Sequence, residues 1–522
     1  MSNKRISNNS SVGVSRTQKA KLNISTALLA QVVSMLCGLI VPRLMLETFG
    51  SELYGATTSI TSFLAYISLI EGGVAGVARA ALYKPLANSD LQEISGIYNE
   101  SKHFFRIVGG IFVLYTIALA CGYNSLAKDI ELDRWFSASL VLAISVSTLA
   151  QYMFGISNVI LVQADQKNYI INILSITTVL INTLFIILLT RFGCNIIIVK
   201  LVSSCIFIIR PVVLTIYVKK HYKLFTSREC HKTGALNQKW TALGQHIAFF
   251  LHTNTDVVVL TILADLKTVA VYSVYNMVIS NIRSLVASSY NGLESIFGNM
   301  YAKGETDHLD RVFGYYETFI SIVAISLFST TAAMIVPFVK LYTIGITDVN
   351  YIIPQFAIVA VLAELVFILR TPYHYLVNAA NRFKQTKYAA YGEAIINMVL
   401  SVVLVFQYGI VGVAIATLLA MMFRSIYYSI YISKHIIHRK ITLYIKRNII
   451  NFGTFGIIVL VGNTILSRVS TNNYLSWALC GFLVLLIAAA ITLLSNCLFY
   501  REDVISILKR TKIPLHLLNR KQ

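Results

Sequence analysis

About fourteen apolar segments, each long enough to cross a bilayer, follow one another along the chain. They lie near residues 22–42, 55–77, 104–124, 135–160, 168–190, 194–218, 240–263, 268–298, 314–338, 352–378, 385–406, 409–433, 449–468 and 474–499. A helix needs about 20 mainly apolar residues to cross the hydrocarbon core, because every backbone polar group must be satisfied internally there. Hydrophobic residues form 56% of the chain and charged residues 13%, which excludes a water-soluble domain of this size. The sequence therefore predicts an all-α polytopic membrane protein with about 14 transmembrane helices.

The sequence also repeats itself. A block that reads R-x5-I-Y-x2-K-H begins at Arg210 and again at Arg424, and nearly the same offset superposes Tyr98 on Tyr316. We interpret the two stretches as copies of one membrane unit, an arrangement that many transporters use. Six helices in each copy is an even number, so both copies enter the membrane from the same side and are related by an axis along the membrane normal.

This repeat predicts two pseudo-symmetric six-helix lobes plus two C-terminal helices. The expected regions are a cytoplasmic N-terminal segment (1–21), an N-lobe with helices one to six (22–218), a cytoplasmic linker (219–239), a C-lobe with helices seven to twelve (240–433), the last two helices with their preceding loop (434–500) and a basic cytoplasmic tail (501–522). The first apolar segment has spanning length and no small-residue cleavage site, so we expect it to remain as a helix.

The formal charge of +21 comes from lysines and arginines in the short connections between apolar segments. Connections on one side carry most of them, which predicts that this side and both termini face the cytoplasm. Topology thus explains the charge without nucleic acid. The seven cysteines are scattered, with no C-x2-C pair, so we expect no metal site.

Helix eight carries a polar stripe within its predicted span. Its members are Tyr272, Asn276, Ser280, Arg283, Tyr290 and Glu294. Separations of 3, 4, 7 and 11 residues return to nearly the same helix face. Such a stripe is typical of a helix that lines an aqueous cavity, although Arg283 and Glu294 could instead pair with neighbouring helices and brace the bundle.

Four other groups are candidates for ion coupling. His252 and Asp256 lie one turn apart in helix seven, and a carboxylate at membrane depth can hold a proton or a sodium ion. An internal hydrogen bond that satisfies both groups is the alternative. Glu71 in helix two and Glu364 in helix ten are the other candidates.

Arginines outnumber acids at membrane depth, which suggests an anionic passenger because guanidinium binds phosphate in a bidentate fork. Arg283 and Arg370 are the main candidates for this contact, with His374 one turn beyond Arg370. The repeat mates Arg210 and Arg424 could serve as scaffold instead.

Several loose motifs accompany these charges. They are Pro42-Arg43, Asn254-Thr255-Asp256, Val271-Tyr272-Ser273, Arg370-Thr371-Pro372-Tyr373 and Asn378-Ala379-Ala380. With the helix count, they make the chain resemble polysaccharide repeat-unit flippases of the Wzx type. These belong to a superfamily that also contains drug and toxin extruders and lipid II flippases.

The resemblance implies export of a polyprenyl-pyrophosphate-linked oligosaccharide to the outer leaflet by alternating access, for O-antigen, capsule or exopolysaccharide synthesis. It implies a bacterial cytoplasmic (inner) membrane location, Arg43, Arg283 and Arg370 as head-group contacts, and a groove by the last two helices for the lipid tail. Membrane lipids, a polysaccharide polymerase and export machinery would be the partners.

Two other functions remain open. One is a multidrug or metabolite exporter of the same superfamily, and the other is a membrane glycan polymerase or polytopic glycosyltransferase. The enzyme is disfavoured because no connection exceeds roughly 25 residues and no exposed acidic pair is evident. We expect no cofactor, and no G-x4-G-K-[ST] loop occurs, so we expect no direct use of ATP. The sequence leaves the driving force open, with an H⁺ or Na⁺ gradient as the candidate.

Overall fold

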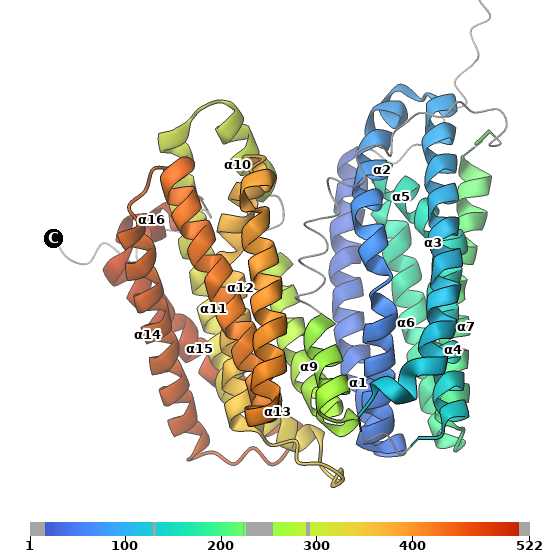
Figure 1. Ribbon diagram of the computed structural model, residues 1–522. Coiled ribbons are helices and arrows are strands. Elements are labelled where there is room, and N and C mark those ends of the chain that lie inside the picture. Colours follow the sequence, from blue (N-terminus) through green and yellow to red (C-terminus); the bar gives the residue numbers. More distant parts are fainter. Residues whose placement is uncertain (1–15, 129–131, 223, 226–253, 289–292, 511–522) are drawn as a thin grey trace, which may run out of the picture. The chain divides into compact units, whose positions relative to one another are not determined.

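The computed structural model describes residues 16–128, 132–222, 224–225, 254–288 and 293–510, which form helices and short connections (Figure 1). The chain divides into two compact units. Unit 1 comprises residues 1–44, 67–121 and 134–243, and unit 2 comprises residues 45–66, 122–133 and 244–522.

Unit 1 is built from most of the first seven helices. They are α1 (Arg16–Ala65), whose second part belongs to unit 2, α2 (Ser68–Asn88), α3 (Leu91–Leu126), α4 (Arg134–Ala150), the π-helical turn Gln151–Gly155, α5 (Ile156–Ala164), α6 (Asn168–Arg191) and α7 (Ile196–His221). The side chain of Asn195 accepts a hydrogen bond from the Ile197 amide (3.1 Å) and so caps the start of α7. Within this unit α7 packs against α4 and α6.

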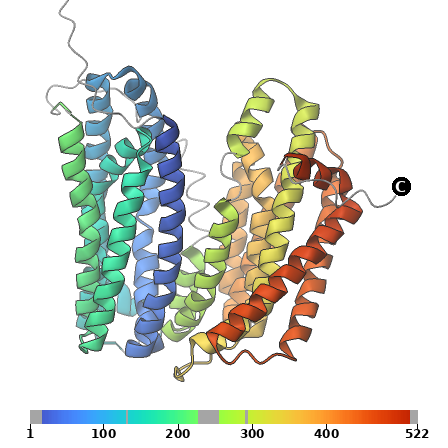
Figure 2. The same cartoon turned by 180° about the vertical axis from the view of Figure 1, so that it is seen from behind.

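Unit 2 contains the site discussed below. Its helices are Asn254–Leu263, α9 (Leu266–Ser288), α10 (Leu293–Ala302), α11 (Thr306–Tyr342), α12 (Pro354–Ala379), α13 (Phe383–His435), α14 (Ile441–Leu466), α15 (Tyr474–Phe499) and α16 (Arg501–Arg510). α12 packs against α13 and α11, while α14 and α15 pack on α11, as the view from behind also shows (Figure 2). α11 and α12 therefore form the centre of unit 2.

The all-α fold class is confirmed. Ten helical ranges of the described residues are long and apolar enough to cross a membrane. Two of these ranges, Gln18–Glu71 and Gln385–His435, contain 54 and 51 residues, and each covers two predicted spans. Non-helical glycines mark the kinks, Gly50 with a φ of 78° and Gly409 with a φ of 55°. Positive φ at these two positions suits glycine, which has no Cβ to clash.

Two predicted spans follow a different pattern. Helix seven (240–263) lies mainly outside the described residues, which resume at Asn254. Helix eight (268–298) corresponds to α9 and α10, with residues 289–292 between them outside the described part.

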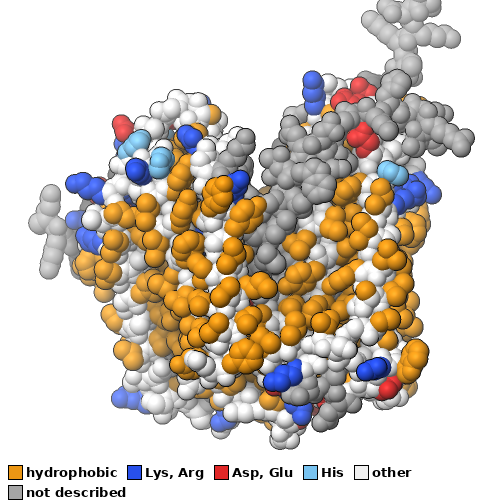
Figure 3. All heavy atoms as spheres, viewed as in Figure 1, with side chains coloured by type: hydrophobic (Ala, Val, Ile, Leu, Met, Phe, Trp, Pro, Cys, Tyr) orange, Lys and Arg blue, Asp and Glu red, His pale blue; other side chains and the backbone are white. Residues whose placement is uncertain are grey.

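Hydrophobic side chains cover the middle of the helices in the space-filling view, whereas Lys and Arg gather toward their ends (Figure 3). The lobe boundaries predicted from the sequence remain a prediction.

One close approach fixes the start of α9. A Cβ on Gly55 would collide with the backbone of Leu266, so the second half of α1 and the beginning of α9 touch through glycine. Nearby, Asp348 accepts hydrogen bonds from the amide and the hydroxyl of Ser51, both at 2.7 Å. Tyr275 of α9 donates to the Tyr351 carbonyl at 2.8 Å. These contacts hold the α9 stripe in a defined register.

A polar cluster ties together three parts of unit 1. Asp165, which follows α5, accepts a hydrogen bond from Tyr222 (2.5 Å) and forms ion pairs with Lys167 (2.7 Å) and Lys19 (3.3 Å). Burial alone would raise the pKa of Asp165, but the hydrogen bonds from Lys167 and Tyr222 and the two ammonium charges outweigh it. The pKa of this carboxyl therefore lies below its usual range.

Candidate functional site

A buried carboxylate organises the polar centre of unit 2. Asp256, 4% exposed on the helix Asn254–Leu263, accepts a hydrogen bond from the Tyr272 hydroxyl of α9 at 3.1 Å. From α13, Thr417 Oγ1 lies 3.2 and 3.0 Å from the two carboxylate oxygens, and Asn397 Nδ2 lies 3.3 Å from Oδ1. Side chains from two helices, α9 and α13, thus converge on one carboxylate.

The same cluster gathers further oxygen atoms. Thr417 Oγ1 also lies 3.0 Å from Asn397 Oδ1 and 3.1 Å from the Val413 carbonyl. Ser401, one turn after Asn397, donates to Asn397 Oδ1 at 3.4 Å. Carboxylate, hydroxyl, amide and carbonyl oxygens are the ligands of hard cations. Among the residues that the structure describes, no group of three or more His, Cys, Asp or Glu could hold a metal ion.

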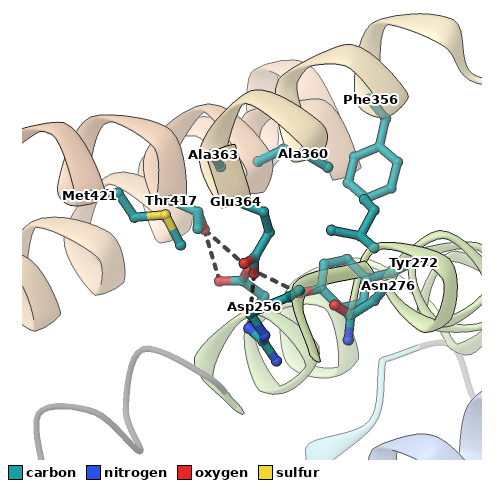
Figure 4. Close-up of a pocket in the computed structure, with 12 residues that line it drawn as sticks. Asp256, Tyr272, Asn276, Phe356, Ala360, Ala363, Glu364, Thr417 and Met421 are labelled. Carbon is teal, nitrogen blue, oxygen red and sulfur yellow. Dashed lines mark hydrogen bonds and ion pairs between the residues drawn. The ribbon is translucent and has the colours of Figure 1, made fainter. Parts of the chain in front are cut away.

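An ion pair lies beside the carboxylate. Arg283 of α9 contacts Glu364 of α12 through Nη1 and Oε1 at 3.0 Å, with 28% of the arginine side chain and 13% of the glutamate side chain exposed. The second carboxylate oxygen of Glu364 is buried without a hydrogen-bond partner. The close-up shows Asp256, Glu364, Thr417 and Tyr272 pointing toward one another (Figure 4).

These groups line a cavity of about 60 Å³. Its lining residues are Asp256, Tyr272, Asn276, Ile279, Arg283, Phe356, Ala360, Ala363, Glu364, Ala414, Thr417 and Met421. One water needs roughly 10–15 Å³ of such space, so the cavity can admit several waters or a partly hydrated cation. Two carboxylates and one guanidinium at membrane depth are unusual, and they make this cavity the candidate functional site.

The structure brings together five of the residues expected from the sequence: Tyr272, Asn276, Arg283, Asp256 and Glu364 all line this cavity. The helical stripe is thus present on α9. Glu294 lies on α10 with an exposed side chain. Tyr290 and His252, the remaining candidates of helices seven and eight, lie outside the described residues.

Arg370 and His374 lie elsewhere on α12. Arg370 is 5% exposed and binds Glu393 of α13 at 2.7 Å, while Arg424 binds the other oxygen of Glu393 at 2.5 Å. The His374 ring stacks on Tyr428, with the ring centres 6.1 Å apart. Arg370 also borders a mainly apolar cavity of about 500 Å³ between α12, α13 and α14. The structure therefore places it outside the Asp256 cavity, and its expected head-group contact stays a prediction.

The candidates in unit 1 lie in other surroundings. Glu71, at the start of α2, accepts a hydrogen bond from Tyr152 at 2.9 Å. Arg43 is half-buried in α1, one residue after Pro42. Arg210 of α7 donates to Thr178 of α6 at 2.5 Å, a contact that suits the scaffold alternative for this arginine.

Sequence reasoning missed Asn397, Thr417 and Glu393. Each is a polar residue within a predicted apolar span, which is the signal that could have found them. Glu393 lies near the start of the span 385–406 and is 0% exposed. Asn397 and Thr417 are 1% and 8% exposed. The sequence cannot identify the partner of a single polar residue in a long apolar segment, because that partner is set by how the helices pack.

Comparison with known proteins places this architecture. No family model matches the sequence, and no curated protein matches it. Among solved structures, the lipid II flippase MurJ in an inward closed conformation has 17% identity and a TM-score of 0.64, and the match covers 92% of this chain and 99% of that chain. The MATE multidrug transporter DinF-BH has 15% identity and a TM-score of 0.59, over 83% of this chain and 98% of that chain.

An inward-facing MATE transporter of the MOP superfamily has 16% identity and a TM-score of 0.54, over 80% of this chain and 98% of that chain. The chain has the fold of MOP-superfamily transporters. At these identities the likeness defines the fold and leaves the passenger open. The Asp256 cavity thus lies in a helical membrane protein whose structural neighbours are transporters.

Proposed function

We propose that this protein moves a polyprenyl-pyrophosphate-linked oligosaccharide from the inner to the outer leaflet by alternating access, for surface polysaccharide synthesis of the Wzx type. The observation that carries the proposal is the extent of the fold match. The lipid II flippase aligns with 92% of this chain, whereas the multidrug transporters align with 80% to 83%. Because this chain shares more of its architecture with the lipid II flippase than with the multidrug transporters, we favour a passenger with a lipid tail.

Arg283 is the group that would meet the pyrophosphate in unit 2. It is the one cationic side chain among the described residues that line the Asp256 cavity. Its Nη1 pairs with Glu364, and 28% of its side chain is exposed. A phosphate could therefore replace Glu364 as the partner of the guanidinium. Such an exchange would release Glu364 to take up a proton or another partner, which would link passenger binding to the charge state of the cavity.

Asp256 would be the coupling group. Asp256, Asn397 Oδ1, Thr417 Oγ1 and the Val413 carbonyl offer oxygens from two elements, within reach of one small cation. A sodium ion would neutralise the buried carboxylate and join the helix Asn254–Leu263 to α13. Thr417→Val removes one oxygen at nearly constant volume and should weaken sodium binding about tenfold or more, as for groups that support a metal site. Sodium titration of tryptophan fluorescence would measure this. Unchanged affinity would exclude Thr417 as a ligand, and no response of the native protein to sodium would favour proton coupling.

Flipping itself can be measured in liposomes that contain the purified protein and a fluorescent polyprenyl-pyrophosphate saccharide. Leaflet transfer is followed with a membrane-impermeant quencher. We expect transfer with the native protein and at least a tenfold slower rate for Arg283→Ala, because a charged hydrogen bond contributes about 1.5–3 kcal/mol. Arg191→Ala, an exposed arginine at the end of α6, is the matched control. Equal rates for both variants would contradict the role of Arg283.

A second function has one observation in its favour. Two carboxylates and one arginine line the cavity, and this acidic balance suits an organic cation. The same liposomes can test export of a cationic dye. Dye export without saccharide transfer would make the protein a multidrug exporter.

We further propose a bacterial cytoplasmic membrane location with both termini in the cytoplasm, and a polysaccharide polymerase as a partner. Reporter fusions at the two termini test the topology, because a cytoplasmic fluorescent reporter folds only on that side. Co-purification from the native membrane tests the partner.

A further inference from the structure

A second cavity lies in unit 1, between α3 and α7 and the segment that follows α7. It has a volume of about 480 Å³, and its walls include Tyr98, Lys102, Arg106, Lys219 and Tyr222. This volume is eight times the 60 Å³ of the Asp256 cavity. It is large enough for a phosphorylated head group.

Specific hydrogen bonds build the walls of this cavity. The Phe225 amide donates to Ser95 Oγ at 3.0 Å, and Asn99 Nδ2 donates to the Phe225 carbonyl at 3.1 Å, so the chain after α7 folds back on α3. Tyr98 donates to Asn158 of α5 at 2.8 Å, and Asn158 Nδ2 donates to Thr215 of α7 at 2.9 Å. The cavity is therefore a formed site, held by three helices.

The lining is strongly basic. Lys102, Arg106 and Lys219 line the cavity together with His103, and the charges of Arg106 and Lys219 lie close enough to act on the Lys102 ammonium. Lys102 is half-buried above the Tyr98 ring, 5.8 Å from its centre. No carboxylate in the described part of the chain forms an ion pair with Lys102, Arg106 or Lys219. Like charges held together without a counter-charge are unfavourable unless an anion joins them.

The second copy of the repeat carries different residues at the positions that correspond to these cations. By the repeat offset, Lys102 and Arg106 correspond to Ile320 and Ala324 of α11, and Asn99 corresponds to Glu317. In unit 2 the segment after α13 also folds back on its helix, and Arg439 from that segment binds Glu317 at 3.0 Å.

The charges of the second copy are balanced within the chain. Arg447 of α14 binds Glu317 at 3.2 Å and Asp503 of α16 at 3.0 Å, and Arg439 also binds Asp310 at 2.8 Å. General enrichment of cytoplasmic loops in basic residues would not explain this difference between the described parts of the two copies. Where the second copy has Glu317 and Asp310, the first copy has the uncharged residues Asn99 and Gln92.

We propose that the α3–α7 cavity binds a phosphate-bearing anion, which takes the place that carboxylates occupy in the second copy. Lys102, Arg106 and Lys219 neutralise the phosphate oxygens, and the Tyr98 and Tyr222 rings flank the group. The anion is either a lipid head group at the membrane surface or a soluble phosphate compound. This inference is independent of the passenger that the Asp256 cavity would carry.

The test uses the full-length protein in nanodiscs and two probes. Inorganic pyrophosphate is titrated calorimetrically in phosphatidylcholine nanodiscs, and phosphatidylglycerol is exchanged for phosphatidylcholine while the melting temperature is followed. We expect at least one probe to bind, and the triple variant Lys102→Gln, Arg106→Gln, Lys219→Gln to weaken that binding about tenfold or more. Saturation by pyrophosphate would identify a soluble ligand, and a response to phosphatidylglycerol alone would identify a lipid head group.

The matched control is Lys434→Gln, Lys440→Gln, Lys446→Gln, which removes three exposed cations from unit 2 and changes the net charge equally. It should bind both probes as the native protein does. Arg106→Lys keeps the charge and should retain most of the binding, which separates charge recognition from a folding defect. Arg283→Ala removes only the contact proposed for the Asp256 cavity and should not affect this site. The proposal would be overturned if neither probe binds the native protein, or if both triple variants lose binding equally.

Discussion

The buried ion pairs of Glu393 give the sharpest stability prediction. Glu393 is 0% exposed and accepts charged hydrogen bonds from Arg370 at 2.7 Å and from Arg424 at 2.5 Å. Arg424 also donates to the Tyr428 hydroxyl at 2.8 Å. Glu393→Gln keeps the size of the side chain and removes the one negative charge that both guanidinium groups contact.

The size of the effect follows from burial. Removing one partner of a buried ion pair costs about 3–5 kcal/mol, because the other charge stays in a medium of low dielectric constant. Both arginines share a single carboxylate, and the glutamine carbonyl can still accept one hydrogen bond, so we expect about 3–4 kcal/mol for the whole network. Total stabilities are about 5–15 kcal/mol, so this is a large fraction.

The free energy of unfolding can be measured by titration of the purified protein with dodecyl sulfate, followed by tryptophan fluorescence. Glu305→Gln, an exposed glutamate just before α11, is the matched control and should change stability by less than about 0.5 kcal/mol. Replacing Arg370, Glu393 and Arg424 together by leucine should cost less than Glu393→Gln alone, because no unbalanced charge remains. Equal stability of Glu393→Gln and Glu305→Gln would refute a structural role for this network.

Two other substitutions test the packing and the connections. Gly55→Ala should destabilise unit 2 by about 1–3 kcal/mol, since its Cβ meets the Leu266 backbone, whereas Gly76→Ala has open space and should be neutral or stabilising in the same titration. Asp165→Asn should remove a pH dependence. The depressed pKa of Asp165 means that its stabilising contribution is present above the unfolded pKa of about 4 and is lost as the pH falls through the folded value. The native protein should therefore exceed this variant in stability at pH 7 and approach it below about pH 4, and a constant difference across that range would contradict the assignment.

Much of the fold could be predicted from the sequence because apolar length decides it. The two kinks could not be predicted from apolar length. Gly50 and Gly409 separate predicted spans, and helix extends up to each of these non-helical glycines from both sides. Apolar length locates a span, and backbone geometry at glycine decides how two spans join.

The site was partly predictable for a similar reason. Tyr272, Asn276 and Arg283 follow the helical period, so one helix predicts their common face. Asn397 and Thr417 lie 20 residues apart in sequence, and only the packing of α13 across its kink brings them to Asp256. The excess of buried arginine suggested an anionic contact for Arg370 and gave no sign of its ion pair with Glu393 on the neighbouring helix. Pairing across helices is tertiary information that composition does not contain.

The most direct test of the account measures whether a sodium gradient drives flipping and whether this dependence requires Asp256. Liposomes containing the native protein and a fluorescent polyprenyl-pyrophosphate saccharide are given an inward or an outward sodium gradient, or none, at constant pH. We predict that the direction of the gradient changes the rate of leaflet transfer in the native protein. In Asp256→Asn, which keeps the shape and removes the charge, transfer should no longer depend on sodium. The account is contradicted if the native protein transfers no saccharide, or if Asp256→Asn responds to the gradient as the native protein does.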